Sequence, residues 1–327
     1  MRLFVVCMLG FVCLGVVSAA NEATTAVAPP PAKEAAVPVD INLIASYLDQ
    51  GDTLGLHYTR ARPTEIDFAI QGEKGYFPAC ITINLDAKTI YMATFVGKLN
   101  PGNEHNADIL AQLMEENYVS NWTKIEWDKN KGDVRISYTF MCDDGFPYDE
   151  FAFIREQLKV SSNSVQAILN KGQPGIDEPK PTDKQEAPPV VTQAELAAIL
   201  DQRGITYTIK NESTLEFDAK GDNATFLVQI RLDPKLDFLY LAIPYIITVP
   251  PDSPQAGIIM PALMDLNFRS GLTKFEWFRK AGEVRSSFVF HVKHIFSSTA
   301  FMTALLELIK TTDLAYPTLS RLESAQS

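Results

Sequence analysis

The sequence predicts an α+β protein made of two repeated domains, each a mostly antiparallel sheet flanked by helices. Two observations carry this prediction. Residues 114–127 align with residues 264–277 at a constant offset of 150, and both segments contain Thr-Lys-x-Glu-Trp. Each copy also shows short extended segments joined by turns, with a few amphipathic helical segments between them, which is typical of an α+β sheet. A repeat of this length, present twice, indicates two domains with separate cores and not a solenoid.

The elements of one copy follow in the same order as those of the other. An amphipathic helix comes first, and four extended segments rich in aromatic and β-branched residues follow it. A longer helix, a hairpin and a final helix complete the copy. For the first copy we expect helices at 41–49, 104–118 and 148–158 and strands at 56–60, 65–71, 77–85, 89–96, 123–127 and 133–142; the second copy has helices at 193–203, 255–268 and 298–309.

The segments outside the repeats differ from them in composition. Arg2, an apolar run over 3–17 and small residues at 18–20 predict a cleavable signal peptide over residues 1–20, cut near Ala19 or Ala20. We therefore expect a secreted or periplasmic protein with no integral membrane segment after cleavage. The remaining boundaries are a disordered Ala/Pro-rich spacer (21–39), a first domain (40–170), a Pro-rich linker (171–191), a second domain (192–322) and a tail (323–327).

The hairpin can be aligned residue by residue. Placing Glu126 opposite Arg135 pairs Trp127 with Val134, and alternation then points Trp127 and Val134 toward the core. The same register in the second copy places Glu276 opposite Arg285. The charged residues on the opposite face, kept in both copies, are Lys124, Glu126, Arg135, Lys274, Glu276 and Arg285. They are either exposed cross-strand ion pairs, the interpretation we favour, or a binding surface shared by the repeats.

These motifs resemble one known family. In both copies the long helix ends in Asn117-Tyr118 or Asn267-Phe268, and Thr-Lys-x-Glu-Trp, a Gly turn and Val-Arg-x-Ser follow; the last helix leads to Tyr316-Pro317-x-Leu319. This order resembles the YbjN domain over about residues 41–168 and 192–322, so that the chain resembles a tandem YbjN-domain protein. The resemblance implies a fold like that of type III secretion chaperones, and it carries no catalytic or ligand residue. Two copies and an export signal depart from single-domain intracellular members, so the family's loosely credited signalling or stress-regulatory role is not carried over.

Charge and motifs argue against several kinds of function. With 29 Lys and Arg against 40 Asp and Glu, the net charge of −11 disfavours nucleic-acid binding. His291 and His294, three apart on a strand, point to opposite faces and cannot share a metal. The acidic residues Asp143, Asp144, Asp149 and Glu150 are not spaced as a calcium loop, and we expect a solvated loop there. We therefore expect no cofactor, no metal and no enzyme.

Two cysteines remain after removal of the signal peptide, and they allow two alternatives. Cys80 and Cys142 form an even number in an oxidising compartment, which permits a disulfide. Alternation points Cys80 away from the core and Cys142 toward it, so we favour two free thiols. The second copy has Leu227 and Val292 at these positions, so that the fold does not require a bridge.

The sequence leaves three classes of function open. We expect first an exported non-enzymatic module that binds an unknown protein or peptide, chaperone-like or regulatory. The alternative is a structural or adaptor envelope protein whose repeats form an intramolecular pseudo-dimer, and an unrecognised enzyme ranks last. A binding module should leave an exposed apolar patch, whereas a closed pseudo-dimer should cover its shared surface.

Overall fold

The computed structural model describes residues 39–50, 58–101, 106–143, 145–171, 191–233, 238–292 and 296–324. The expected signal peptide, the spacer up to residue 38 and the linker between residues 172 and 190 lie outside the described residues. Residues Ala36–Ser327 form one compact unit, and the description below concerns that unit alone.

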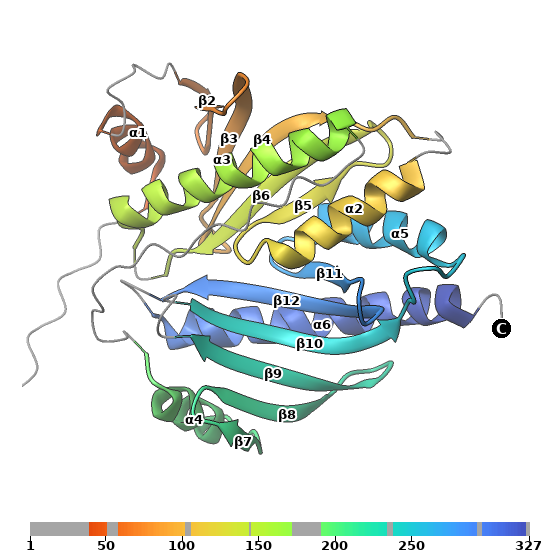
Figure 1. Ribbon diagram of the computed structural model, residues 1–327. Coiled ribbons are helices and arrows are strands. Elements are labelled where there is room, and N and C mark those ends of the chain that lie inside the picture. The colour runs from red at the N-terminus through yellow and green to blue at the C-terminus, as the bar shows by residue number, and fades with distance from the viewer. Residues whose placement is uncertain are drawn as a thin grey trace, which may run out of the picture. The chain divides into compact units, whose positions relative to one another are not determined.

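The first repeat forms one six-stranded antiparallel sheet with helices packed on it (Figure 1). The strand order is β1-β2-β3-β4-β6-β5, so that β5 lies at one edge and β1 at the other. Its elements are α1 (Ile41–Gln50), β1 (Thr59–Arg62), β2 (Glu65–Gln71), β3 (Tyr76–Asn84), β4 (Thr89–Lys98), α2 (Asn106–Val119), β5 (Lys124–Trp127), β6 (Asp133–Met141) and α3 (Tyr148–Lys171).

The second repeat has the same order of elements and the same sheet order, β7-β8-β9-β10-β12-β11. The expected fold class is confirmed, because each repeat is an antiparallel sheet with helices packed on it. Its elements are α4 (Gln193–Gln202), β7 (Thr208–Asn211), β8 (Thr214–Lys220), β9 (Thr225–Asp233), β10 (Phe238–Thr248), α5 (Ala256–Arg269), β11 (Lys274–Phe278), β12 (Glu283–His291) and α6 (Ser298–Ser324).

Each sheet buries one face under its long terminal helix. Along β3 the side chains of Phe77, Ala79, Ile81 and Ile83 are buried, and the residues between them are half-buried or exposed. This period of two is what a strand with a single core face requires. Helix α3 packs on β4 and β6 of the first sheet, and α6 packs on β10 and β12 of the second (Figure 1).

The hairpin register predicted from the sequence is confirmed in both copies. Glu126 pairs with Arg135 and Trp127 with Val134, and Glu276 pairs with Arg285 in the same way. The indole N–H of Trp127 donates to the Leu99 carbonyl at 3.1 Å. A buried indole needs such an acceptor, so the tryptophan fixes the hairpin against the end of β4 as well as filling the core.

The terminal helices are longer than expected. We expected α3 to end at residue 158 and α6 at residue 309, but they reach Lys171 and Ser324. The polar residues beyond 158 look like a helix end in the sequence, yet they have partners in the core. Ser162 is fully buried, and its hydroxyl lies 2.7 Å from that of Thr94 on β4.

Candidate functional site: the interface between the repeats

The two repeats contact each other through α2, α5 and the edge strands β5 and β11. Helix α2 packs on α5, and each of these helices also packs on the edge strand of the other repeat (Figure 1). A Cβ atom placed on Gly257 of α5 would lie 3.8 Å from the Cβ of Ala107, its counterpart on α2 at the offset of 150. Equivalent positions therefore meet, as they do across a two-fold axis.

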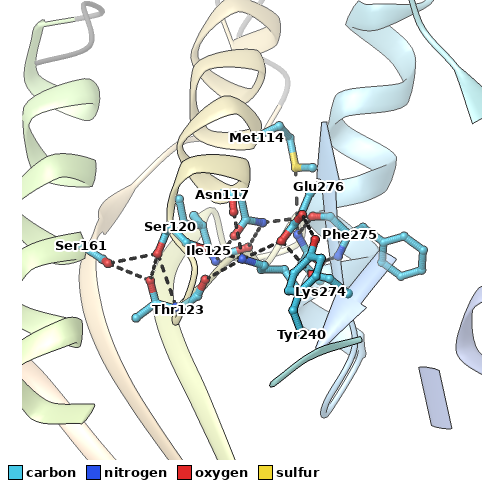
Figure 2. Close-up of polar contacts among 12 residues, drawn as sticks. Met114, Asn117, Ser120, Thr123, Ile125, Ser161, Tyr240, Lys274, Phe275 and Glu276 are labelled. Atoms are coloured by element: carbon cyan, nitrogen blue, oxygen red, sulfur yellow. Dashed lines mark hydrogen bonds and ion pairs between the residues drawn. The ribbon is translucent and has the colours of Figure 1, made fainter. Parts of the chain in front are cut away.

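The lysines of the Thr-Lys-x-Glu-Trp motifs lie at the centre of this interface. Lys274 is 5% exposed, and its ammonium donates to the backbone carbonyls of Asn117 (3.0 Å) and Thr123 (3.5 Å) in the first repeat (Figure 2). It donates to the Ser120 carbonyl as well. Lys124, also 5% exposed, donates to the carbonyls of Ser270 and Gly271 in the second repeat. One lysine of each repeat thus donates to backbone carbonyls between the long helix and the edge strand of the other repeat.

The glutamate of each motif balances its lysine. Glu126 accepts from Lys124 at 3.3 Å, and Glu276 accepts from Lys274 at 2.7 Å. Both carboxylates are 2% exposed. Our expectation of exposed cross-strand ion pairs was therefore wrong: each pair runs along its own strand from Lys to Glu, and the opposite repeat covers it.

Hydroxyl groups satisfy the remaining acceptor positions of these carboxylates. Tyr91 donates to Glu126 at 2.9 Å, and Tyr240 donates to Glu276 at 3.1 Å. Burial, and then the charge of Glu126, raise the pKa of Tyr91 far above its usual value. Burial, opposed by Glu126, lowers the pKa of Lys124, and the nearby charge of Lys274 lowers it further. The tyrosines therefore stay neutral donors, and the two ammonium groups repel each other across the interface.

The asparagine of the Asn-aromatic pair forms hydrogen bonds with backbone groups of an edge strand. Asn267 accepts from the Phe275 N–H at 2.6 Å and donates to the Phe275 carbonyl at 3.0 Å. Asn117 accepts from the Ile125 N–H at 2.9 Å, and its amide also donates across the interface to the Phe275 carbonyl at 3.2 Å (Figure 2). An edge strand otherwise presents unpaired backbone groups. We did not identify these asparagines as site residues, although both copies keep them.

The aromatic residue of the same pair meets the arginine of the other repeat. The Arg285 guanidinium lies 4.8 Å from the centre of the Tyr118 ring, and the Arg135 guanidinium lies 5.3 Å from that of Phe268. Tyr118 also stacks on Phe278 with ring centres 4.7 Å apart. The arginines are thus held by cation–π contacts across the interface, and Arg285 also pairs with Glu283 at 2.9 Å.

Ion pairs at the rim repeat the same symmetry. Lys129 pairs with Asp265 at 3.0 Å, and the counterpart contact joins Arg279 to Glu115 at 3.6 Å. The two cations are 46% and 45% exposed, so each pair contributes little to stability. The six charged residues that both motifs share are therefore brought together, in an interface and not on an open surface.

The other residues singled out from the sequence lie elsewhere. Cys80 and Cys142 are half-buried free thiols, and burial raises the pKa of each. The expectation of a solvated loop was wrong for Glu150, which is 2% exposed on α3 and contacts His291 of the second repeat. Asp143 lies in the predicted loop and pairs with Lys88 at 2.9 Å. Asp144 and His294 are outside the described residues.

No group of three or more His, Cys, Asp or Glu side chains in the described part of the chain is arranged to hold a metal ion. Among the helices that the structure describes, none is long and apolar enough to cross a bilayer.

Comparisons with known proteins include a likeness to a solved structure. No protein-family model matches the chain, and no curated protein sequence matches it. The crystal structure of YbjN from E. coli, described only as a candidate transcription regulator, is similar to part of the chain with a TM-score of 0.32 and 15% identity. The match covers 41% of this chain and 94% of YbjN.

Proposed function

We propose that the chain is an exported, non-enzymatic binding or adaptor protein whose two repeats act as one pseudo-dimeric body. The reciprocal lysine contacts support the pairing of the repeats in this proposal. Lys124 and Lys274 each donate to loop carbonyls of the opposite repeat, and both are 5% exposed. A surface that is buried in this way is used between the repeats, so a partner must bind elsewhere on the body.

The pairing of the repeats can be tested by a designed disulfide. The 3.8 Å separation between the Ala107 Cβ and a Cβ on Gly257 matches the Cβ–Cβ distance of about 3.8 Å in disulfides. We expect the double variant A107C/G257C to link α2 to α5. After protease cleavage of the linker between residues 172 and 190, the two halves should stay joined without reductant and separate with it.

Matched variants make this test specific. Cys80→Leu and Cys142→Val, which copy the second-repeat residues Leu227 and Val292, remove the native thiols from the background. The single variants Ala107→Cys and Gly257→Cys should give no linked product. Failure of the double variant to link in the oxidised protein would contradict the pseudo-dimer.

The sheet faces opposite the core offer a place for a partner. Tyr76 on β3 and Leu227 on β9 occupy positions that alternate with the core residues, and they are 63% and 41% exposed. We propose that these faces bind a protein or peptide. In a pull-down with the full chain, the partner should be lost with Y76S/L227S and kept with Leu314→Ser, a change at an exposed leucine on α6. Equal loss with both variants would contradict this location.

Export can be tested independently of binding. N-terminal sequencing of the protein recovered outside the cytoplasm should begin at Ala20 or Asn21, as cleavage after Ala19 or Ala20 requires. A chain that retains Met1 in that fraction would contradict cleavage.

A further inference from the structure

Many contacts between the repeats would also fit two copies of the same repeat. Lys124 and Lys274 each donate to backbone carbonyls of the opposite repeat, so this contact is made in both directions. At the rim, a cation of each repeat pairs with a carboxylate of the other. Contacts that either repeat can offer cannot decide which repeats pair, because specificity is a difference between two affinities.

One side of the interface holds an aromatic cluster to which both repeats contribute. Trp122, between α2 and β5, meets the ring of Phe238 on β10 edge-on, with ring centres 5.6 Å apart. It also meets the ring of His291 on β12 edge-on, at 5.4 Å. The Phe153 ring of α3 stacks on the His291 ring with centres 4.3 Å apart and planes 7° from parallel. We call these four residues the ring cluster.

The equivalent positions on the other side of the interface hold no aromatic residue. The strand register places Thr89 opposite Met141 in the first repeat, just as it places Phe238 opposite His291 in the second. The offset of 150 gives the counterparts of the other two members. The residues that correspond to Trp122, Phe153, Phe238 and His291 are, in this order, Leu272, Thr303, Thr89 and Met141.

A pair of like repeats would lose the contacts of the ring cluster. Two first repeats would each contribute Trp122 and Phe153, with no ring at the facing positions. Two second repeats would each contribute Phe238 and His291, again with no ring at the facing positions. Only a first repeat paired with a second repeat brings all four rings to one side, and each ring contact favours that pair by a factor of about two or more.

We propose that the ring cluster makes the first repeat select a second repeat as its partner and reject the first repeat of another copy. This inference rests on the pseudo-dimer proposed above. Pairing of like repeats would join two copies of the chain, and each copy would keep one repeat with which to join a third. The linker favours pairing within one chain. The ring cluster adds the choice of repeat, and together they prevent the assembly of open-ended chains.

Cysteines at the positions that meet on α2 and α5 can report this choice. The full chain with A107C/G257C, in the background without Cys80 and Cys142, is cleaved in the linker and equilibrated in a glutathione redox buffer. Equivalent positions meet in every pairing, so mixed and like pairs all form linked products, which mass spectrometry separates. Random pairing would give about equal amounts of mixed and like products. We expect about a tenfold excess of the mixed product, because the contributions of the separate ring contacts multiply.

The chain supplies matched variants for this test. W122L/F153T removes both rings of the first repeat and copies the second-repeat residues Leu272 and Thr303. It should reduce the excess to about equal amounts of mixed and like products. Trp122→Leu alone, which keeps the Phe153–His291 stack, should leave about a twofold excess. L272A/T303A, the change at the equivalent positions of the other side, should keep the full excess.

The remaining outcomes overturn different statements. If A107C/G257C gives mixed and like products in about equal amounts, the pseudo-dimer stands and the selection between repeats falls. An undiminished excess in Trp122→Leu and W122L/F153T, or an equal fall in L272A/T303A, would overturn the role of the ring cluster. If A107C/G257C gives no linked product of any kind, the pseudo-dimer itself fails.

Discussion

Replacement of Lys274 by methionine tests how strongly the interface holds the fold. Methionine keeps an unbranched apolar chain but removes the ammonium. In the structure that ammonium lies 2.7 Å from Glu276 and 3.0 Å from the Asn117 carbonyl of the other repeat. Lys274→Met leaves Glu276 buried with its two hydroxyl donors, Tyr240 and Ser287, but without a cation.

The expected cost is large because the charge left behind is buried. Removal of one partner from a buried ion pair costs about 3–5 kcal/mol. Glu276 is 2% exposed, so water cannot replace the ammonium without disruption of the interface. A loss of this size is a large part of the about 5–15 kcal/mol by which native domains are stable. K274M/E276Q should be more stable than Lys274→Met alone, because no unpaired charge remains.

The assay is urea denaturation of the full chain, followed by circular dichroism. Lys280→Met is the matched control, since Lys280 is exposed in the turn after β11 and its loss should change stability by less than about 0.5 kcal/mol. Lys124→Met should behave like Lys274→Met, because its ammonium has the equivalent partners. A cost below about 1 kcal/mol for Lys274→Met, or no rescue by the second substitution, would refute the reasoning.

Three further variants test other contacts. Asn267→Ala should cost about 2 kcal/mol in urea denaturation, since it leaves the backbone N–H of Phe275 without the amide oxygen and its carbonyl with the Asn117 donor alone; a neutral effect would show that water replaces the amide. Gly282→Ala should lower the thermal midpoint, because Gly282 has φ +68° and a Cβ there would lie 2.9 Å from the Val249 carbonyl oxygen; an unchanged midpoint would contradict this. Burial alone would raise the pKa of Asp313, but backbone N–H donors, that of Asn223 first, lower this pKa below its usual value of 3.8. The ionised Asp313 therefore stabilises the fold above pH 3.8, and this stabilisation is lost as the pH falls through the lowered pKa. Asp313→Asn should therefore destabilise at neutral pH and flatten the acid limb of a stability–pH curve, and parallel curves for the two proteins would contradict it.

The hairpin shows what the sequence can predict. The register of Glu126 with Arg135 and the core side of Trp127 follow from period-two alternation, which is a local property of a strand. The same alternation cannot tell whether the opposite face meets water or protein. Lysine and glutamate on a strand are usually solvated, and only the other copy supplies the carbonyls that let Lys124 be buried.

Two other features depended on contacts distant in the sequence. The Asn117-Tyr118 and Asn267-Phe268 pairs were visible as a shared motif, but their roles became clear only once β11 and α2 were seen in contact. The length of α3 was underestimated because Ser162 is a polar residue that the core accommodates through Thr94. In both cases a polar side chain has a buried partner that lies far from it in the sequence.

The reciprocal interface also determines how the molecule behaves on dilution. Two separate subunits joined by such contacts would dissociate as their concentration falls. Here residues 172–190 connect the repeats, so each meets the other at an effective concentration that short linkers place in the millimolar range. Covalent continuity thus makes the pairing independent of protein abundance. It also lets a substitution appear on one side only, as at His291, whereas a homodimer would carry every change twice.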